Sequence, residues 1–478
     1  MYKPFRRILT ALAFSCSYFV AFALATEPAA QPTAMQFGSV KAYNLVMSFT
    51  PTVADGYLIF KSTKPITDTP VDATTYQKGQ GLSSCKVMYV GANNIHSVRE
   101  ILEGTKYYFK VFAYNGTGNQ INYKQTNPLT DSVTSLASDA GNYYSAIDSN
   151  SGTFLADLHA LINNHTMVAY VSYKYNIVPA IFERDTIGAK AVVNCEYSNV
   201  TTVYTPPFDF VAQSYNREHT LCKSWMQTAA QFGANNLIDY PEGADYFNLL
   251  FTHSNPNQVR SNNPLGVVVN VVSTYGESKF GNDNTGNLVF EPKDGSKGDA
   301  ARAMMYEMIC YDGLSGGWGL EELPSQAYQQ DQNLLKLWSQ QDPPDKFERT
   351  KNEYINFLQR NRNPFIDHPG WATCINFDSI VKTNLCGIVS GIRDETHSFN
   401  LNVYPNPSTD LLNIELSGSE FGEAEISVFN VYGIEVLKSE TQHKKSRINT
   451  GIFESGNYLL RITSNGNSVI RKFFIIHS

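Results

Sequence analysis

The sequence has few of the residues that hold zinc or that cross-link a small secreted fold. Only 7 of its 478 residues are cysteine, and no two of them form a Cys-x-x-Cys pair. This spacing argues against a structural zinc site. With 37 basic and 44 acidic residues the net charge is −7, so no positive surplus indicates a nucleic-acid binder. That exclusion is weak, because attraction of a charged ligand depends on the local potential around a cleft.

Long apolar runs are also missing, except at the N-terminus. Three basic residues precede a mostly apolar stretch from Ile8 to Leu24, and residues 23–25 (Ala-Leu-Ala) offer an A-x-A cleavage site. The pattern predicts a secretory signal peptide over residues 1–25, with an uncleaved membrane anchor as the alternative. No later run approaches the roughly 18 apolar residues that a spanning helix needs. We therefore expect no stable membrane span once the signal is cleaved.

Cleavage would remove Cys16 and leave six cysteines in an exported protein, where they can oxidise. Cys374 and Cys386 are close in sequence and are the best candidates for a disulfide. The connectivity of the others cannot be deduced from the sequence; they are Cys85, Cys195, Cys222 and Cys310.

The length favours about three domains, and 17% charged with 13% aromatic residues is typical of well-packed β-rich domains. Short alternating strands fill residues 35–136, most clearly Tyr107–Tyr114, which is followed by an Asn-Gly turn. The segment Leu102–Tyr107 resembles the fibronectin type III signature, in which the tyrosine hydroxyl bonds back to a nearby backbone group. The resemblance implies a fibronectin type III-like β-sandwich for spacing or surface binding, and no residue in it suggests chemistry.

Residues 137–389 show helical spacing as well as strand-like runs, and this pattern predicts a mixed α+β domain. Helical spacing covers Leu155–Ile162 and Asp299–Ile309, and we expect Asp299 to be the N-cap of the second helix. A third helix is predicted to start after Pro344 and to end before Asn361. The β-branched run Val267–Val272 suits a buried strand.

Two segments of this region carry residues suited to phosphodiester hydrolysis, Asn216–Thr220 (NREHT) and Asn257–Asn262 (NQVRSN). A divalent cation can neutralise the phosphate and the leaving oxygen, while an imidazole takes a proton from water. Magnesium prefers oxygen ligands and needs only one or two protein groups, which Glu218 and Asn257 could supply. His219 suits the base because its unperturbed pKa lies near neutral pH. An adjacent Glu-His pair alone, however, is more often structural than catalytic.

Two arginines complete the candidate site. Arg217 precedes the Glu-His pair, and Arg260 follows Asn257 by three residues. Either guanidinium could contact a substrate phosphate or support the site as scaffolding. A second acid–imidazole pair, Asp367-His368, is interpreted as a structural cap.

Four ordered blocks of sequence resemble the secreted endonuclease I family, whose catalytic unit is a ββα-metal (His-Me) finger. Their agreement in order makes the resemblance far more specific than any one motif. They are Asn216–Trp225, Asp245–Pro264, Phe290–Arg302 and Asn361–Pro369.

The resemblance implies that His219 activates water and that Glu218 and Asn257 hold Mg²⁺, with Mn²⁺ or Ca²⁺ as alternatives. It also implies cuts in DNA, and often in RNA, that leave 5′-phosphates. Two positions depart from the family pattern: Phe247 stands where many members have histidine, and Leu221-Cys222 replaces an aromatic-proline pair. Both could alter rate or substrate preference, and neither removes a predicted ligand.

After a polar linker at residues 390–400, the segment 401–478 resembles a type IX secretion sorting domain. A small C-terminal β-sandwich is expected there. The resemblance implies passage through the periplasm and the type IX secretion machinery, then release or attachment at the cell surface. The matching motifs are Val403–Ser408, Val428–Gly433, Ser455–Ile462 and Arg471–Phe474.

The sequence thus predicts a multidomain chain carrying a secreted, Mg²⁺-dependent endonuclease with little sequence specificity, expected to act as a monomer. DNA is the expected substrate, with RNA as a second. The alternative is a surface adhesin, or a protein that binds nucleic acid or carbohydrate, whose nuclease-like domain is inactive. Cleavage of plasmid with and without magnesium distinguishes the two hypotheses.

Overall fold

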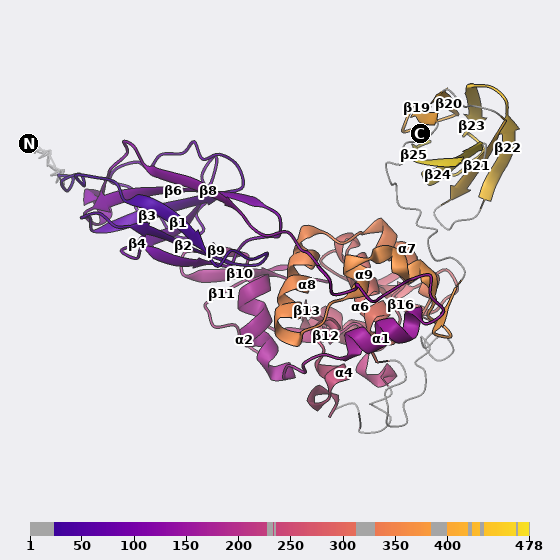
Figure 1. Ribbon diagram of the computed structural model, residues 1–478, viewed down its shortest axis with the longest axis horizontal. Helices are drawn as coiled ribbons and strands as arrows, with labels where there is room; N and C mark the ends of the chain where they lie inside the picture. Colours follow the sequence, from indigo (N-terminus) through magenta and orange to yellow (C-terminus); the bar gives the residue numbers. More distant parts are fainter. Residues whose placement is uncertain are drawn as a thin grey trace, which may run out of the picture. The chain divides into compact units, whose positions relative to one another are not determined.

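The computed structural model describes residues 23–226, 233, 236–311, 330–383, 399–418, 423–430, 435–464 and 467–477. It divides after Ile388 into two units, each described here by itself (Figure 1). Nearly all of the predicted signal peptide and linker lies outside the described residues, as does Cys386. No described helix combines the length and apolarity that crossing a membrane requires.

The N-terminal part of the first unit is a β-sandwich, as predicted. In β2, every second side chain is buried, and those side chains are Leu45, Met47 and Phe49. The backbone N–H of Leu102 donates a 2.8 Å hydrogen bond to the Tyr107 hydroxyl, which is the contact that the fibronectin-like signature implies. One sheet has the order β1-β2-β5 (Thr33–Gly38, Leu45–Thr50, Ile95–Val98). The other joins β4, β3, β6, β7 and β8 (Lys86–Gly91, Gly56–Ser62, Lys106–Asn115, Asn122–Tyr123, Leu129–Thr134).

The rest of the first unit is the predicted mixed α+β region. Its centre is helix α6, which is buried along almost its whole length and packs against α1, α7 and α9. The helices are α1, α2, α4 and α5 (Phe154–Asn163, Tyr173–Ile177, Pro241–Ala244, Ser254–Arg260) and α6 to α9 (Lys297–Cys310, Gln332–Gln341, Lys346–Gln359, Pro364–Asp367). The small sheets are β9 to β11 (Asp185–Ile187, Lys190–Asn194, Thr201–Tyr204), β12 and β13 (Tyr215–His219, Leu249–His253), β14 to β16 (Asn270–Tyr275, Ser278–Asn282, Leu288–Glu291), and β17 and β18 (Ile375–Asn376, Val381–Lys382).

The three predicted helices are present, but one predicted cap is wrong. Helix α8 begins where expected, because the Asp345 side chain accepts a hydrogen bond from the Glu348 N–H. Helix α6 begins at Lys297 rather than after Asp299. The carboxylate of Asp299 instead pairs with Arg302 one turn later at 3.0 Å, so it is used inside the helix and not at its end.

The run Val267–Val272 is not a buried strand, which corrects the prediction. Val271 and Val272 lie in β14 and are 54% and 64% exposed, and only Val268 in the run is buried. The reason is position: β14 is the edge of a three-stranded sheet. Branched side chains favour strand geometry, but they do not determine whether anything packs over the strand.

The sandwich and the α+β region pack together through α8. The Glu103 carboxylate pairs with Arg349 at 2.9 Å, and its backbone N–H donates to the Thr350 hydroxyl at 2.9 Å. Tyr43 of the sandwich lies edge-on to Tyr354, with ring centroids 4.9 Å apart. Figure 1 shows α8 at the end of the sandwich. These contacts make the two parts one unit, while the domain boundaries at residues 136 and 389 stay predictions.

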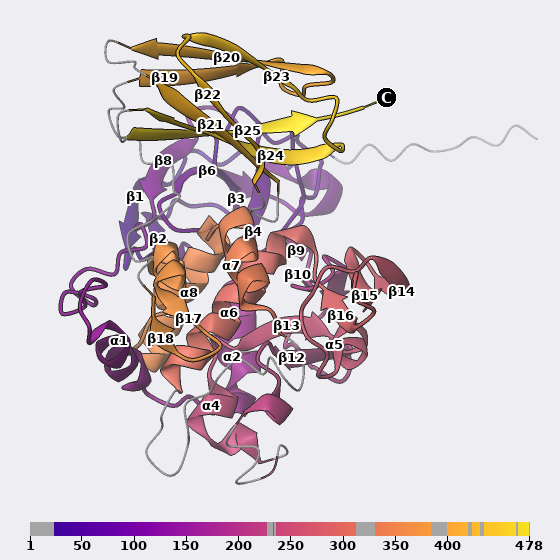
Figure 2. The same ribbon diagram turned by 90° about the vertical axis from the view of Figure 1, so that its right-hand side faces the viewer.

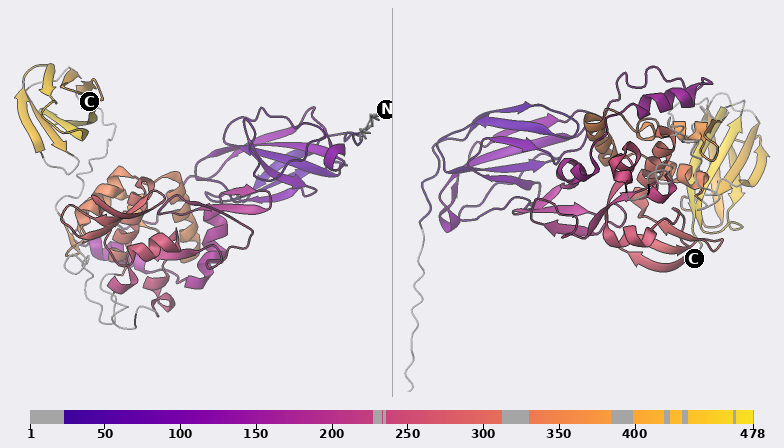
Figure 3. Two further views of the ribbon diagram at one scale, coloured as in Figure 1. Left: turned by 180° about the vertical axis from the view of Figure 1, so that it is seen from behind. Right: turned by 90° about the horizontal axis from the view of Figure 1, so that it is seen from below.

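The second unit is a small sandwich of two antiparallel sheets, as predicted (yellow in Figure 3). Its core is apolar and includes Leu412, Val428, Leu460, Ile462 and Phe473. One sheet is β19-β20-β23 (Phe399–Tyr404, Leu411–Gly418, Lys445–Asn449). The other is β22-β21-β24-β25 (Glu435–Thr441, Ala424–Asn430, Gly456–Ser464, Asn467–Ile475).

Cys374 is disulfide-bonded. Its predicted partner Cys386 lies beyond the described residues, so that pairing stays a prediction. The other four described cysteines are free and buried: Cys85, Cys195, Cys222 and Cys310.

Candidate active site

Two strands and a short helix bring the two candidate segments together. Strand β12 pairs antiparallel with β13, so that Glu218 faces Leu250 and His219 faces Leu249. Helix α5 follows β13 directly and packs on both strands (Figure 2). Asn257 and Arg260 are three residues apart on α5 and therefore share one face of the helix. The result is a ββα arrangement with all five candidate residues on β12 and α5.

Glu218 is held by a buried ion pair. Its side chain is 6% exposed, and its Oε1 lies 2.5 Å from Nη1 of Arg260. The Tyr197 hydroxyl donates a second hydrogen bond to Oε1 at 3.2 Å. The other oxygen, Oε2, accepts no hydrogen bond from any described residue. Burial raises the pKa of Glu218, while Arg260 opposes that shift. Arg260 and Tyr197 thus hold Oε1 of the carboxylate, and Oε2 is available to a ligand.

Arg260 is fully buried, and its donors are used within the protein. Besides the ion pair with Glu218, Nη1 donates to the His219 carbonyl at 2.9 Å and Nη2 to the Thr220 carbonyl at 2.7 Å. One guanidinium therefore ties the end of β12 to α5. Of the two roles predicted for Arg260, this geometry favours scaffolding over contact with a substrate phosphate.

The imidazole of His219 is buried and has a fixed orientation. Its Nε2 lies 2.8 Å from the carbonyl oxygen of Gly243 in α4. Because a carbonyl oxygen can only accept, Nε2 must carry the proton, and Nδ1 is left as the basic nitrogen. The Tyr170 ring stacks on the imidazole, with centroids 5.7 Å apart and planes 13° apart. Burial lowers the pKa of His219 to about 3, so the ring is neutral near pH 7.

Arg217 lies beside His219, because residues two apart in a strand share a face. Its guanidinium carbon is 4.1 Å from the Tyr170 ring centroid and 4.2 Å from that of Phe210. The Tyr170 ring therefore contacts both Arg217 and His219. The positive charge of Arg217 also contributes, after burial, to the lowered pKa of His219. Unlike Arg260, Arg217 is only half-buried and has no ion pair with a described residue.

Asn257 is half-buried on α5, and its side chain makes no hydrogen bond to a described residue. Its backbone carbonyl accepts from the Ser261 N–H at 3.0 Å, which closes the last turn of the helix. The amide oxygen is thus available beside the Arg260 that holds Glu218.

Sequence reasoning missed the residues that position this site. Asn248 clamps the chain after His219, since its side chain accepts from the Leu221 N–H at 2.8 Å and donates to the Leu221 carbonyl at 3.2 Å. Tyr197 and Tyr170 contact Glu218 and His219 from segments at least 21 residues away. Only Asn248 had a signal in the sequence, because it lies within the second block that resembles the endonuclease I family, Asp245–Pro264.

The two departures from the family pattern are both buried. Phe247 packs on Tyr306 in the core, with ring centroids 4.9 Å apart. The Cys222 thiol donates to the Ser261 carbonyl at 3.5 Å, and burial raises its pKa to about 12. Neither side chain displaces a predicted ligand.

The second acid–imidazole pair is structural in its contacts. Asp367 forms an ion pair with Arg362 at 2.7 Å and accepts a hydrogen bond from Tyr144 at 2.9 Å. His368 stacks on Trp371, with ring centroids 4.2 Å apart.

A cluster of His165, Asp245 and Cys310 has ligand atoms within 4.8 Å of one another, which is short enough for a metal ion. The oxygens of Asp245 are already occupied, however, because Oδ2 accepts from Tyr306 at 2.7 Å and from Tyr311 at 2.8 Å. Its Oδ1 accepts from Gln359 and from a backbone N–H, each at 2.9 Å. Burial also raises the pKa of the Cys310 thiol well above its usual value. The cluster is therefore a hydrogen-bonded part of the core.

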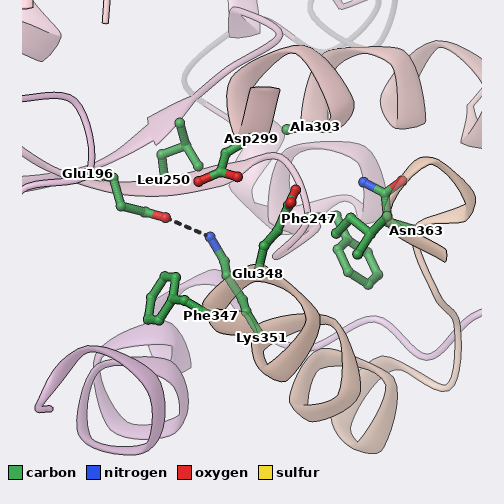
Figure 4. Close-up of a pocket in the computed structure, with 10 residues that line it drawn as sticks. Glu196, Phe247, Leu250, Asp299, Ala303, Phe347, Glu348, Lys351 and Asn363 are labelled. Atoms are coloured by element: carbon green, nitrogen blue, oxygen red, sulfur yellow. Dashed lines mark hydrogen bonds and ion pairs between the residues drawn. The ribbon is translucent and has the colours of Figure 1, made fainter. Parts of the chain in front are cut away.

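A small cavity of about 20 Å³ lies beneath β13, with room for about one water molecule. Figure 4 shows Lys351 reaching across it to Glu196, and the two groups are 3.1 Å apart. Phe247 and Leu250 form its apolar wall. This enclosed ion pair supports β13, the strand that pairs with β12, and the cavity does not admit a substrate.

Comparison with known proteins identifies two parts of the chain. A family described as Endonuclease I matches residues 151–370, and a secretion system C-terminal sorting domain matches residues 402–476. An extracellular ribonuclease of Bacillus amyloliquefaciens is 32% identical over 263 residues, covering 51% of this chain and 82% of that protein. Its counterpart in Bacillus subtilis (strain 168) is 32% identical over 262 residues, covering 51% and 83%.

Among solved structures, a fibronectin type III domain of human collagen XX aligns with 24% of this chain and 98% of its own length. The identity is 21% and the TM-score is 0.15.

Proposed function

Because this chain belongs to the endonuclease I family, and is thus a nuclease whose sorting domain directs it to secretion or the cell surface, we propose a specific activity for it. It is a metal-dependent endonuclease that hydrolyses phosphodiester bonds of DNA and RNA with little sequence specificity. Both Bacillus relatives are named extracellular ribonucleases, which supports RNA as a substrate beside DNA.

One observation carries the proposal: the arrangement of Glu218 and His219 at the end of β12. A buried carboxylate and a buried neutral imidazole both cost stability, since each is removed from water. Here both are held by specific partners, Arg260 for the carboxylate and the Gly243 carbonyl for the imidazole. Two adjacent ionisable groups that are buried and held by specific partners are typical of a catalytic site.

His219 is the general base in this proposal. Its Nε2–H is fixed by the Gly243 carbonyl, so Nδ1 receives the proton that water loses as it attacks phosphorus. The low pKa keeps the ring unprotonated between turnovers. Tyr170 stacks on the ring and limits its rotation, so the nitrogen stays aimed in one direction.

The donor set fits a hard divalent cation such as Mg²⁺. Glu218 Oε2 and the Asn257 amide oxygen are both without protein partners among the described residues, and Mg²⁺ needs only one or two such oxygens. The nearby Cys222 thiol stays protonated and hydrogen-bonded, so it does not offer the soft ligand that zinc prefers. When bound, the ion would neutralise charge on the phosphate and on the leaving oxygen.

The two arginines have different roles in the proposal. Arg260 is a positioning residue, because it is buried and holds Glu218. Arg217 is the candidate for phosphate contact, since it is half-buried beside His219 and has no carboxylate partner among the described residues. The aromatic rings on either side of its guanidinium restrict its motion, which suits a group that orients a substrate.

The test uses the purified full chain with supercoiled plasmid and with a long RNA, each with Mg²⁺ or with EDTA. We expect cleavage of both substrates with Mg²⁺ and none with EDTA. His219→Ala should lower the cleavage rate about 10²–10⁴-fold, as for a lost general base. The matched control is His368→Ala, which removes the imidazole of the other acid–imidazole pair and should cleave at the wild-type rate.

Equal rates for His219→Ala and the wild type would overturn the mechanism. Failure of the wild type to cleave with Mg²⁺, Mn²⁺ or Ca²⁺, together with retained binding of DNA or glycan, would instead support the alternative of an inactive nuclease-like adhesin.

A further inference from the structure

A second cavity, of about 580 Å³, lies where the N-terminal sandwich meets the nuclease region. Its walls come from β3 and β4 of the sandwich, from the start of β9, and from the first turn of α8. The volume falls in the range of small-molecule sites. None of the five candidate active-site residues lines it, so it is a separate feature of the molecule.

The cavity has a surplus of positive charge. Four basic and two acidic side chains line it. Glu100 is shared by Lys61 at 3.0 Å and Lys78 at 3.4 Å. Asp185 is paired with Lys86 at 2.6 Å. Both carboxylates are thereby used, and the fourth cation, Arg184, has no ion pair with any described residue.

Arg184 is a half-buried cation with one unused donor. Its Nε donates to the Ile181 carbonyl at 2.5 Å, and its Nη1 donates to the carbonyls of Arg99 and Ile101. Nη2 is buried and has no hydrogen-bond partner among the described residues. A buried charge without a counter-ion is costly, and burial lowers the pKa of Arg184 to about 10. An anionic ligand in the cavity would therefore supply the negative charge that no described side chain offers to Arg184.

The remaining wall is apolar and aromatic. The Phe347 ring centroid lies 5.6 Å from the Arg184 guanidinium, and the Tyr107 centroid lies 5.9 Å from Nζ of Lys61. Leu82 and Met88 add apolar surface. A small inorganic anion would contact the basic side chains but not the aromatic rings. A planar group joined to an anion would contact both the basic and the aromatic side chains.

We propose that this cavity binds an organic phosphate of about mononucleotide size, with its phosphate at Lys78 beside the Arg184 guanidinium and its planar ring against Phe347. The inference rests on the geometry of the cavity and not on the proposed nuclease mechanism. It assigns the junction between the sandwich and the nuclease region a ligand of its own.

The test is calorimetric titration of the full chain with adenosine 5′-monophosphate in EDTA, where no divalent ion supports binding at the nuclease site. We expect saturable binding. Adenosine, which lacks the phosphate, and inorganic phosphate, which lacks the ring, should each bind at least about tenfold more weakly, a loss of about 1.4 kcal/mol. Equal affinity for inorganic phosphate would overturn the assignment of the aromatic wall.

Two variants locate the ligand. Arg184→Met and Lys78→Gln should each weaken binding about tenfold, as expected for a lost charge-assisted hydrogen bond. Lys78 is 44% exposed, so its variant keeps the test valid even if Arg184→Met fails to fold. The matched control is Lys106→Gln, which makes the same charge change outside the cavity and should bind as the wild type does.

Absence of binding at millimolar nucleotide, or unchanged affinity in Lys78→Gln, would overturn the proposal. Loss of binding in Glu218→Gln with retention in Lys78→Gln would place the nucleotide in the nuclease site instead, which also overturns it.

Discussion

The buried side chains of strands β6 and β12 differ in chemical character and in their effect on stability. In β6 the inward side chains are apolar or aromatic, and they include Phe109 at 1% exposure and Val111 at 0%. In β12 the buried residues at the end of the strand are Glu218 and His219. Burying apolar surface stabilises a fold, whereas burying ionisable groups costs free energy unless partners compensate. The buried side chains of β6 thus stabilise the fold, whereas burial of Glu218 and His219 in β12 is costly without their specific partners.

Residues from other segments surround the buried side chains of both strands, but those around Glu218 and His219 must be polar groups at specific positions. Arg260, Tyr197 and Gly243 reach Glu218 and His219 from three other segments. A hydrophobic contact tolerates many neighbours, while a buried carboxylate needs a donor at a specific position. Changes around β12 should therefore affect activity and stability together, and changes in β6 should affect stability alone.

Replacing Arg260 with methionine should have the largest effect. It leaves Glu218 buried without its cation, so we expect the free energy of unfolding to fall by about 3–5 kcal/mol. Cleavage should also be lost at temperatures where the variant stays folded. Urea denaturation and plasmid cleavage measure the two effects. The double variant Arg260→Met with Glu218→Gln should regain stability but not activity, and a single variant as stable as the wild type would contradict the role of the ion pair.

Val111→Ala in β6 should cost about 2 kcal/mol of unfolding free energy, because it removes buried methyl groups and leaves a small void. The cleavage rate per folded molecule should not change. The measurement is urea denaturation beside a cleavage assay at a temperature where both proteins are fully folded. A clear change in the cleavage rate would contradict the expectation that β6 affects stability alone, since it would show that the sandwich core influences catalysis.

Tyr197→Phe removes the second hydrogen bond to Glu218 and should cost about 1 kcal/mol. That bond helps to keep the carboxylate ionised, so the Mg²⁺ concentration for half-maximal cleavage should rise about fivefold. Titration of the rate with Mg²⁺ gives the shift. As a control, Tyr173→Phe removes a buried hydroxyl that bonds the Leu249 carbonyl, and its Mg²⁺ dependence should match that of the wild type.

The smallest expected effect concerns His253, at the far end of β13 from the site. Burial lowers its pKa, whereas in the unfolded chain the ring has its ordinary value of about 6.5. The unfolded state therefore binds more protons below that value, and stability falls as the pH falls. His253→Phe removes this contribution. The loss of melting temperature between about pH 7.5 and about pH 5.5 should be smaller in the variant than in the wild type, and an equal loss would show that His253 does not contribute.

Local patterns predicted much of the fold. The alternation in β6, the helical spacing of α1 and the start of α8 after Pro344 are set by nearby residues, and all are present. The Tyr107 hydroxyl bond is also local, because it spans five residues. The prediction for Val267–Val272 failed because burial depends on segments distant in the sequence, and Val271 and Val272 stay exposed. The predicted Asp299 cap failed for a local reason, because Asp299 pairs with Arg302 three residues later in the same helix.

The sequence by itself determined which chemical groups are available to the candidate site. It placed Glu218 next to His219 and Asn257 one helical turn before Arg260, in an order that a ββα unit requires. Tertiary structure alone decided what each group does. Only the fold could show that Arg260 is fully buried against Glu218 and that the Gly243 carbonyl fixes the proton on Nε2 of His219. Only the fold could show, too, that Arg184 lines a cavity and has no ion pair with a described residue. The reason is that a charge's environment depends on which distant segments surround it, and chain order does not specify that.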